Sequence, residues 1–306
     1  MPTKREQFQH SLRAQLLGDR MRRLREERGL TLKYIASYLG VEFSTLARYE
    51  RAEWPFRTDH VAALLDVYGV FAEKDREELL SLSRNAWRVC QWQVEGVKDT
   101  GSAGINEQPT LDPWWILSRT EELCVYAPTV IPPLLQSRDY AEALIRHSDP
   151  NAPMMKVDAQ IRRLIDHQAV LDAKPPMRLL VILEQDLLHR QLGGRLVTAA
   201  QLEHLARVVE RPHVNVVVLP HHTGWHPGIH GGFTVCQMRP PYPPVALLDQ
   251  LTGRALLEAE AAVTYRQAFD RLKETAYSIA ESMSLITTVA EEMGAGTPID
   301  PKKVPV

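Results

Sequence analysis

The sequence of 306 residues has few cysteines and no long hydrophobic run. Its three cysteines, Cys90, Cys124 and Cys236, are far apart and form no CxxC pair, which argues against a zinc ribbon or a thiol redox motif. No stretch approaches the ~18 consecutive apolar residues that a membrane span needs. The charged start MPTKREQFQH lacks the apolar segment of a secretory signal. We therefore expect a cytoplasmic protein with reduced cysteines and no membrane contact.

Charge of one sign is not in large excess, but it is unevenly distributed along the chain. The net charge is -2, from 36 Lys and Arg against 38 Asp and Glu. Residues 1–57 hold 12 basic and 7 acidic side chains, a balance of +5, so the remaining residues carry -7. A basic N-terminal segment on an acidic chain indicates that the first domain meets a polyanion and that the second has another role.

Hydrophobic periodicity predicts five helices in the first 90 residues. Apolar residues recur at helical spacing, and glycines or cap residues mark the ends. The expected helices are, in order, Leu17–Arg28 ended by Gly29, a second capped by Thr31, a third opened by Glu42 or Ser44, a fourth capped by Thr58, and Lys74–Arg88.

The segment from Thr31 to Glu50, TLKYIASYLGVEFSTLARYE, carries the most information about function. Two short helices cross near a right angle where the residue at the closest approach is small and the turn residue tolerates unusual backbone angles. Ala36 and Gly40 stand four apart at those two places. The apolar residues expected between the helices are Ile35, Leu39, Val41, Leu46 and Tyr49.

With its flanks, this segment reads GLTLKYIASYLGVEFSTLARYERAE and resembles the helix-turn-helix of the Xre-type, phage lambda-repressor-like regulators. The resemblance extends from Leu17 to Tyr68. It implies a five-helix all-α domain whose third helix enters the major groove of DNA. The residues assigned to DNA binding are Thr31, Lys33, Glu42, Phe43, Ser44, Thr45, Arg48 and Arg51.

Physical chemistry agrees with this assignment. Hydroxyls bond phosphates or bases, and an arginine can bond O6 and N7 of guanine together. Two interpretations remain for Arg22, Arg23, Arg25 and Arg57. These arginines either contact DNA phosphates or simply face solvent. We expect Trp54 and Phe56 to form a small loop core. Three positions depart from the family pattern, namely Leu32, Glu42 and Phe43.

Beyond a predicted linker the pattern changes to a mixture of strands and helices, which predicts a mixed α/β domain. The expected strands are Met177–Leu183, Val214–Leu219, Gly232–Met238, Val245–Leu248 and Ala255–Glu258. The expected helices are Arg138–Ile145, Met154–Leu171, Thr198–Val209 and one long stretch from Glu258 to Met293. The predicted division is a helix-turn-helix domain over 1–92, a linker over 93–112, an α/β domain over 113–293 and a flexible tail over 294–306.

The second domain contains characteristic sequence segments, among them YAPTVIPPLLQSRDYAEALI at Tyr126–Ile145 and HVNVVVLPHHTGWHPGIHGGFTV further along the chain. From Trp114 to Met293 it resembles the large domain behind an Xre-type motif in actinobacterial antitoxin-like transcriptional regulators. The resemblance implies a partner protein or peptide as ligand for this domain.

Two clusters in the second domain invite a chemical interpretation. The first is His221, His222, His226 and His230 on a Gly/Pro loop, and imidazole is a common zinc ligand. Their spacing matches no helical metal-binding pair, so a solvated or effector-lining loop is the alternative. The second is Glu184, Asp186 and His189 at a strand end, with no GxSxG elbow or phosphate loop nearby in sequence. We therefore expect no enzyme, no metal and no cofactor.

The sequence thus predicts an α+β multidomain protein, with a helix-turn-helix domain followed by a mixed α/β domain. The function that it favours is sequence-specific transcriptional regulation by binding a double-stranded DNA operator. One helix-turn-helix covers a half-site, so we expect a homodimer on an inverted repeat. The alternatives are a helical module that has lost DNA binding, an antitoxin-like module that binds a small partner protein, and a metal-dependent enzyme.

Overall fold

The computed structural model describes residues 11–86, 92–94, 113–239, 242, 244–250 and 253–295. The chain divides into two compact units. The first comprises Met1–Asp112, Pro240–Pro244 and Gln250–Ala259, and the second Pro113–Arg239, Val245–Asp249 and Glu260–Val306. Within the described residues, no helix is both long and apolar enough to span a bilayer. Most of the predicted linker and tail lies outside the described residues, and the predicted domain boundaries stay a prediction.

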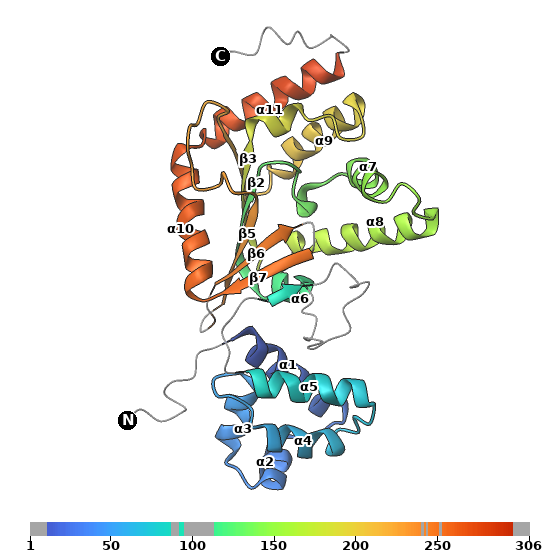
Figure 1. The fold of residues 1–306 in the computed structure, drawn as a ribbon, viewed down its shortest axis with the longest axis vertical. Helices are drawn as coiled ribbons and strands as arrows, with labels where there is room; N and C mark the ends of the chain where they lie inside the picture. Colours follow the sequence, from blue (N-terminus) through green and yellow to red (C-terminus); the bar gives the residue numbers. More distant parts are fainter. Residues whose placement is uncertain are drawn as a thin grey trace. The chain divides into compact units, whose positions relative to one another are not determined.

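The first unit contains the five predicted helices (Figure 1). Two predicted details are wrong. The first helix begins earlier than Leu17, since Ser11 accepts a hydrogen bond from the Ala14 amide and caps it. Thr58 is the first helical residue of the fourth helix and not its cap, a position that Arg57 occupies. The helices are α1 (Leu12–Glu27), α2 (Leu32–Leu39), α3 (Phe43–Glu50), α4 (Thr58–Val67) and α5 (Glu73–Asn85).

A short strand pair also belongs to the first unit. Strand β1 (Trp92–Val94) pairs antiparallel with β7 (Gly253–Glu258), which comes from the far end of the chain. The Glu258 carboxylate accepts a hydrogen bond of 2.9 Å from the Leu12 amide in the first turn of α1. Segments that are distant in sequence therefore stabilise the start of α1.

The second unit is built on a mixed sheet in which the strands lie in the order β6-β5-β2-β3-β4. Strands β2, β3 and β4 are parallel, whereas β5 is antiparallel to both β2 and β6. Together with the helices of the first unit, this confirms the α+β multidomain fold. The strands are β2 (Thr120–Ala127), β3 (Arg178–Glu184), β4 (Val214–Leu219), β5 (Phe233–Met238) and β6 (Val245–Gln250).

Helices cover both faces of this sheet, with α10 on one side and α7 and α8 on the other (Figure 1). Helix α10 buries Ala268, Phe269 and Leu272 against side chains of the strands, including Cys124 and Phe233. Burial of these apolar groups supplies the main stabilisation of the layer. The helices are α6 (Pro113–Leu117), α7 (Arg138–Ser148), α8 (Met154–Gln168), α9 (Arg195–Val208), α10 (Glu260–Thr275) and α11 (Ile279–Gly294).

Two features of this unit differ from the prediction. The long C-terminal stretch is two helices, because Ser278 opens α11 with a capping box that it forms with Glu281. Strand β2 was not predicted at all. Its sequence, TEELCVYA, is buried at nearly every position, so it shows no alternation of polar and apolar residues.

Candidate nucleic-acid interface

Helices α2 and α3 form the expected helix-turn-helix. The Thr31 hydroxyl accepts a hydrogen bond of 3.2 Å from the Tyr34 amide and caps α2, as predicted. Gly40 ends α2 with a φ of 64°, in the left-handed region that favours glycine. Ile35 and Leu46 are fully buried between the helices. The left-handed turn at Gly40 and the buried side chains of Ile35 and Leu46 fix the orientation of α3 relative to α2.

Helix α3 buries one face and presents the other. Leu46, Ala47, Tyr49 and Glu50 are buried. Phe43 and Ser44 are exposed, and Thr45 and Arg48 are partly exposed. Helix α3 therefore exposes hydroxyl, cationic and aromatic side chains. We call these four side chains the α3 outer face.

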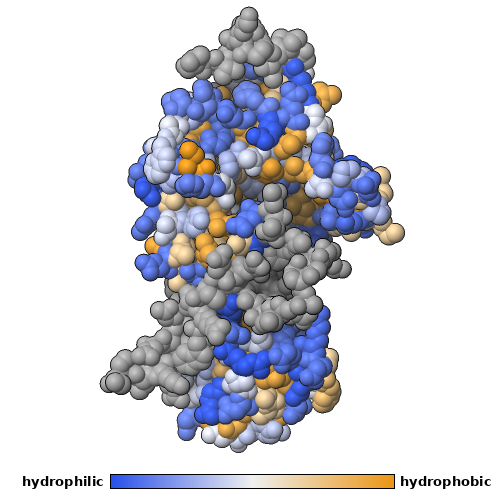
Figure 2. Space-filling view, viewed as in Figure 1, coloured by the Kyte–Doolittle hydropathy of each residue, from blue (hydrophilic) through white to orange (hydrophobic). Residues whose placement is uncertain are grey.

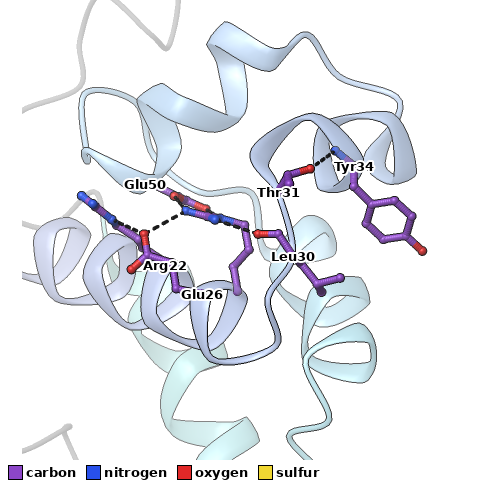
Figure 3. A network of polar contacts seen from close by, with 7 residues as sticks. Arg22, Glu26, Leu30, Thr31, Tyr34 and Glu50 are labelled. Carbon is purple, nitrogen blue, oxygen red and sulfur yellow. Dashed lines mark hydrogen bonds and ion pairs between the residues drawn. The ribbon is translucent and has the colours of Figure 1, made fainter.

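A buried ion pair joins α1 to the C-terminal end of α3. The Arg25 Nε atom lies 2.7 Å from Glu50 Oε1, and a second guanidinium nitrogen donates to Glu50 Oε2 at 2.8 Å. The third nitrogen donates to the Leu30 carbonyl at 2.9 Å in the loop between α1 and α2. The two side chains are only 8% and 4% exposed. Figure 3 shows this network from close by.

This ion pair overturns one sequence-based possibility. Arg25 was a candidate for a phosphate contact, but its three guanidinium nitrogens are engaged inside the domain. The hydrogen bond to Glu50 raises the pKa of Arg25, so its charge is fixed. Arg25 therefore positions α3 and is not part of a DNA-contacting surface.

The remaining basic candidates lie at the surface. The Arg48 guanidinium stands over the Trp54 ring, 4.5 Å from its centroid, and its Nε is 3.9 Å from a Glu53 carboxylate oxygen. Arg51 also bonds Glu53, at 2.6 Å. Arg57 pairs with Asp59. These contacts hold the cations near the C-terminal end of α3 without burying them.

On the other elements, Lys33 in the first turn of α2 and Arg23 on α1 are exposed and form no ion pair within the described residues. Arg22 is exposed but pairs with Glu26 at 2.9 Å. The predicted loop core is present at Phe56, which is buried with its ring centroid 4.9 Å from that of Tyr49. Trp54 is half-buried and supports Arg48.

The histidine loop of the second unit does not assemble a metal centre in the described part of the chain. No group of three or more His, Cys, Asp or Glu side chains there is arranged to hold a metal ion. The rings of His221 and His222 stack edge to face at 5.7 Å. The other two predicted histidines separate, since His226 turns towards the strands while His230 is exposed.

The structure does bring three polar side chains together at the carboxyl ends of β2 and β3. The Tyr126 hydroxyl donates to Glu184, and His226 Nε2 lies 3.6 Å from the same carboxylate. Burial and the bond to Glu184 raise the pKa of Tyr126. Glu184 and His226 were candidates from the sequence, each in a different cluster, whereas Tyr126 was not, because β2 was not predicted as a strand. Asp186 and His189 are exposed and take no part in the cluster.

Comparisons with known proteins divide the chain in a similar way. A family model described as a helix-turn-helix domain matches residues 16–79. A second model, described as a domain of unknown function (DUF5753), matches residues 118–288. No curated protein matches the chain.

Proposed function

Because the chain belongs to the family of the domain of unknown function DUF5753 and carries a helix-turn-helix domain, we propose that it is an Xre-type, sequence-specific transcriptional regulator. The helix-turn-helix domain supports DNA binding. The α3 outer face supports the second part of the proposal, which is that binding depends on the DNA sequence. Its Ser44, Thr45 and Arg48 extend from a helix that the buried Arg25–Glu50 pair holds in place.

In this proposal α3 lies in the major groove. Arg48 bonds a guanine through O6 and N7, a contact that contributes about 1 to 3 kcal/mol of discrimination between bases. Ser44 and Thr45 donate hydrogen bonds to bases or phosphates. Thr31 and Lys33 at the start of α2, together with Arg51, contact the phosphate backbone. Such backbone contacts hold the protein in register but do not read the sequence.

Substitution of Arg48 tests the proposal. A duplex is first selected by the full chain from random DNA, and its affinity is then measured by fluorescence anisotropy. Arg48→Ala is expected to weaken binding to the selected duplex by about 1 to 3 kcal/mol and to bind a scrambled duplex nearly as wild type does. Arg84→Ala is the matched control, because Arg84 is an exposed arginine on α5 that pairs with Glu77. Failure to select any sequence would exclude the proposal.

We further propose that the protein acts in the cytoplasm as a homodimer on an inverted repeat, with half-sites about 34 Å apart. The second domain, in this proposal, binds a small partner protein or an effector, as in antitoxin-like regulators, and has no enzymatic role. Analytical ultracentrifugation of the protein alone, with a single half-site and with the full repeat tests the dimer. If one protomer binds a half-site as tightly as the protein binds the full repeat, the proposed dimer is contradicted.

A further inference from the structure

Phe43 is the most unusual residue of the α3 outer face. It is the first residue of α3 and is 54% exposed, although its side chain is entirely apolar. The buried residues of α3 begin later, at Leu46, and about half of the Phe43 side chain stays open to a ligand. Because α3 is the helix that enters the major groove in the proposed function, an exposed aromatic ring at its first residue is placed to contact a bound duplex. In Figure 2, hydrophobic residues form small patches on a mainly hydrophilic surface.

The residue before Phe43 indicates which part of DNA this end of α3 meets. Glu42 is exposed, and within the described residues its carboxylate makes no hydrogen bond that caps the helix. A carboxylate there repels phosphates but can accept a hydrogen bond from the amino group of cytosine. The first turn of α3 also contains no basic side chain, since Arg48 is the first cation along the helix. The N-terminal end of α3 therefore suits base edges better than the phosphate backbone.

The floor of the major groove offers one apolar group. Guanine, adenine and cytosine present hydrogen-bond donors and acceptors there, and thymine adds its C5-methyl group. A phenyl ring packed on the polar groups would leave them without partners, which costs free energy. Packed on the methyl group, it buries apolar surface on both sides. We propose that Phe43 reads a thymine through its C5-methyl group and is a specificity-determining residue. This inference rests on the DNA-binding function proposed above.

Deoxyuridine gives a direct test, since it differs from thymidine only in lacking that methyl group. Each thymine of the selected duplex is replaced singly by deoxyuridine, and binding of the full chain is measured at one salt concentration. We expect one position in each half-site at which the replacement weakens wild-type binding about fourfold, the factor expected for one buried methyl-sized group. Phe43→Ala should bind the thymine and deoxyuridine duplexes equally. Phe43→Leu should keep part of the difference.

Phe71→Ala is the matched control. Phe71 is 77% exposed in the same unit, but it lies between α4 and α5 and not on the α3 outer face. This variant should distinguish thymine from deoxyuridine as wild type does. The Phe43 inference is overturned if no thymine position affects wild-type binding, or if Phe43→Ala still distinguishes the two bases. Those results leave sequence-specific binding intact, whereas failure to select any duplex overturns the proposed function and this inference together.

Discussion

At the scale of single residues, the contact of Arg25 with Glu50 links the first helix of the domain to the end of α3. Both side chains are almost fully buried, and together they form two hydrogen bonds. A buried ion pair of this kind adds little stability over an apolar pair of the same volume, but removal of one partner leaves an uncompensated charge. We infer that its main effect is to fix the position of α3.

Glu50→Ala should therefore destabilise the helical unit strongly. The expected loss is about 3 to 5 kcal/mol of unfolding free energy, because the Arg25 guanidinium stays buried without its carboxylate. Urea unfolding followed by circular dichroism measures the change. Arg22→Ala is the control, since its pair with Glu26 is exposed and should contribute little. Equal effects of the two substitutions would contradict the structural role of the buried pair.

His60 makes the stability of the same unit depend on pH. Its ring packs edge to face on Tyr49, and its Nδ1 atom is buried without a hydrogen-bond partner in the described part of the chain. Burial lowers the pKa of His60, with a smaller opposing effect of Asp59. The unfolded chain therefore binds more protons than the folded one as the pH falls through about 6.5, the ordinary value for histidine.

Stability should accordingly decrease between pH 7.5 and pH 5.5, because protonation of His60 favours the unfolded state. His60→Gln removes this titration and should make the pH dependence shallower. Urea unfolding of the helical unit at the two pH values measures the difference. An unchanged pH dependence in the variant would show that His60 does not titrate differently in the folded state.

At the scale of elements, Gly18 determines how closely α1 approaches α3. A Cβ atom at this position would lie 2.7 Å from the Glu50 carbonyl oxygen and 3.0 Å from that of Tyr49. Both neighbours are backbone atoms, so they cannot move aside as a side chain can. The absence of a side chain at Gly18 therefore contributes to the angle at which α3 is presented.

Gly18→Ala should destabilise the domain although alanine is the better helix former. We expect a loss of about 1 to 3 kcal/mol from overpacking, measured by thermal or urea unfolding. DNA binding should weaken as well, because α1 and α3 are pushed apart. A variant of wild-type or higher stability would indicate that the two helices are less closely packed than described.

The elements that could be predicted from the sequence are those with their own periodicity and caps. The five helices of the first unit have amphipathic stripes and end signals such as Thr31, Gly29 and Gly40, all within short distances along the chain. Strand β3 was predicted from its continuous apolar run, but β2 has two glutamates near its start, and the burial of Glu122 depends on its ion pairs with the distant Arg178 and Arg266. The break between α10 and α11 depends on the Ser278 capping box, which the apolar periodicity obscured.

At the scale of the whole molecule, contacts between residues far apart in the chain could not be predicted from the sequence. The basic N-terminal segment and the helix-turn-helix pattern indicated DNA binding and the residues of the α3 outer face. The burial of Arg25 depends on Glu50, 25 positions further on. The bond of Leu12 to Glu258 spans 246 positions. Arg25 does stand on the buried stripe of α1, eight residues after Leu17 and four after Met21, but no local pattern identifies its partner Glu50, and so it was grouped with the surface arginines.

In the proposed function, α3 reads the major groove with Arg48 on a guanine. Methylation interference tests this most directly, because dimethyl sulfate modifies guanine at N7 in the major groove. With wild type, we expect methylation of one guanine in each half-site to prevent binding. With Arg48→Ala, methylation of that same guanine should no longer matter, while other contacts are kept. If no guanine interferes with wild type, or if the same guanine still interferes with the variant, Arg48 does not read that base and the account is contradicted.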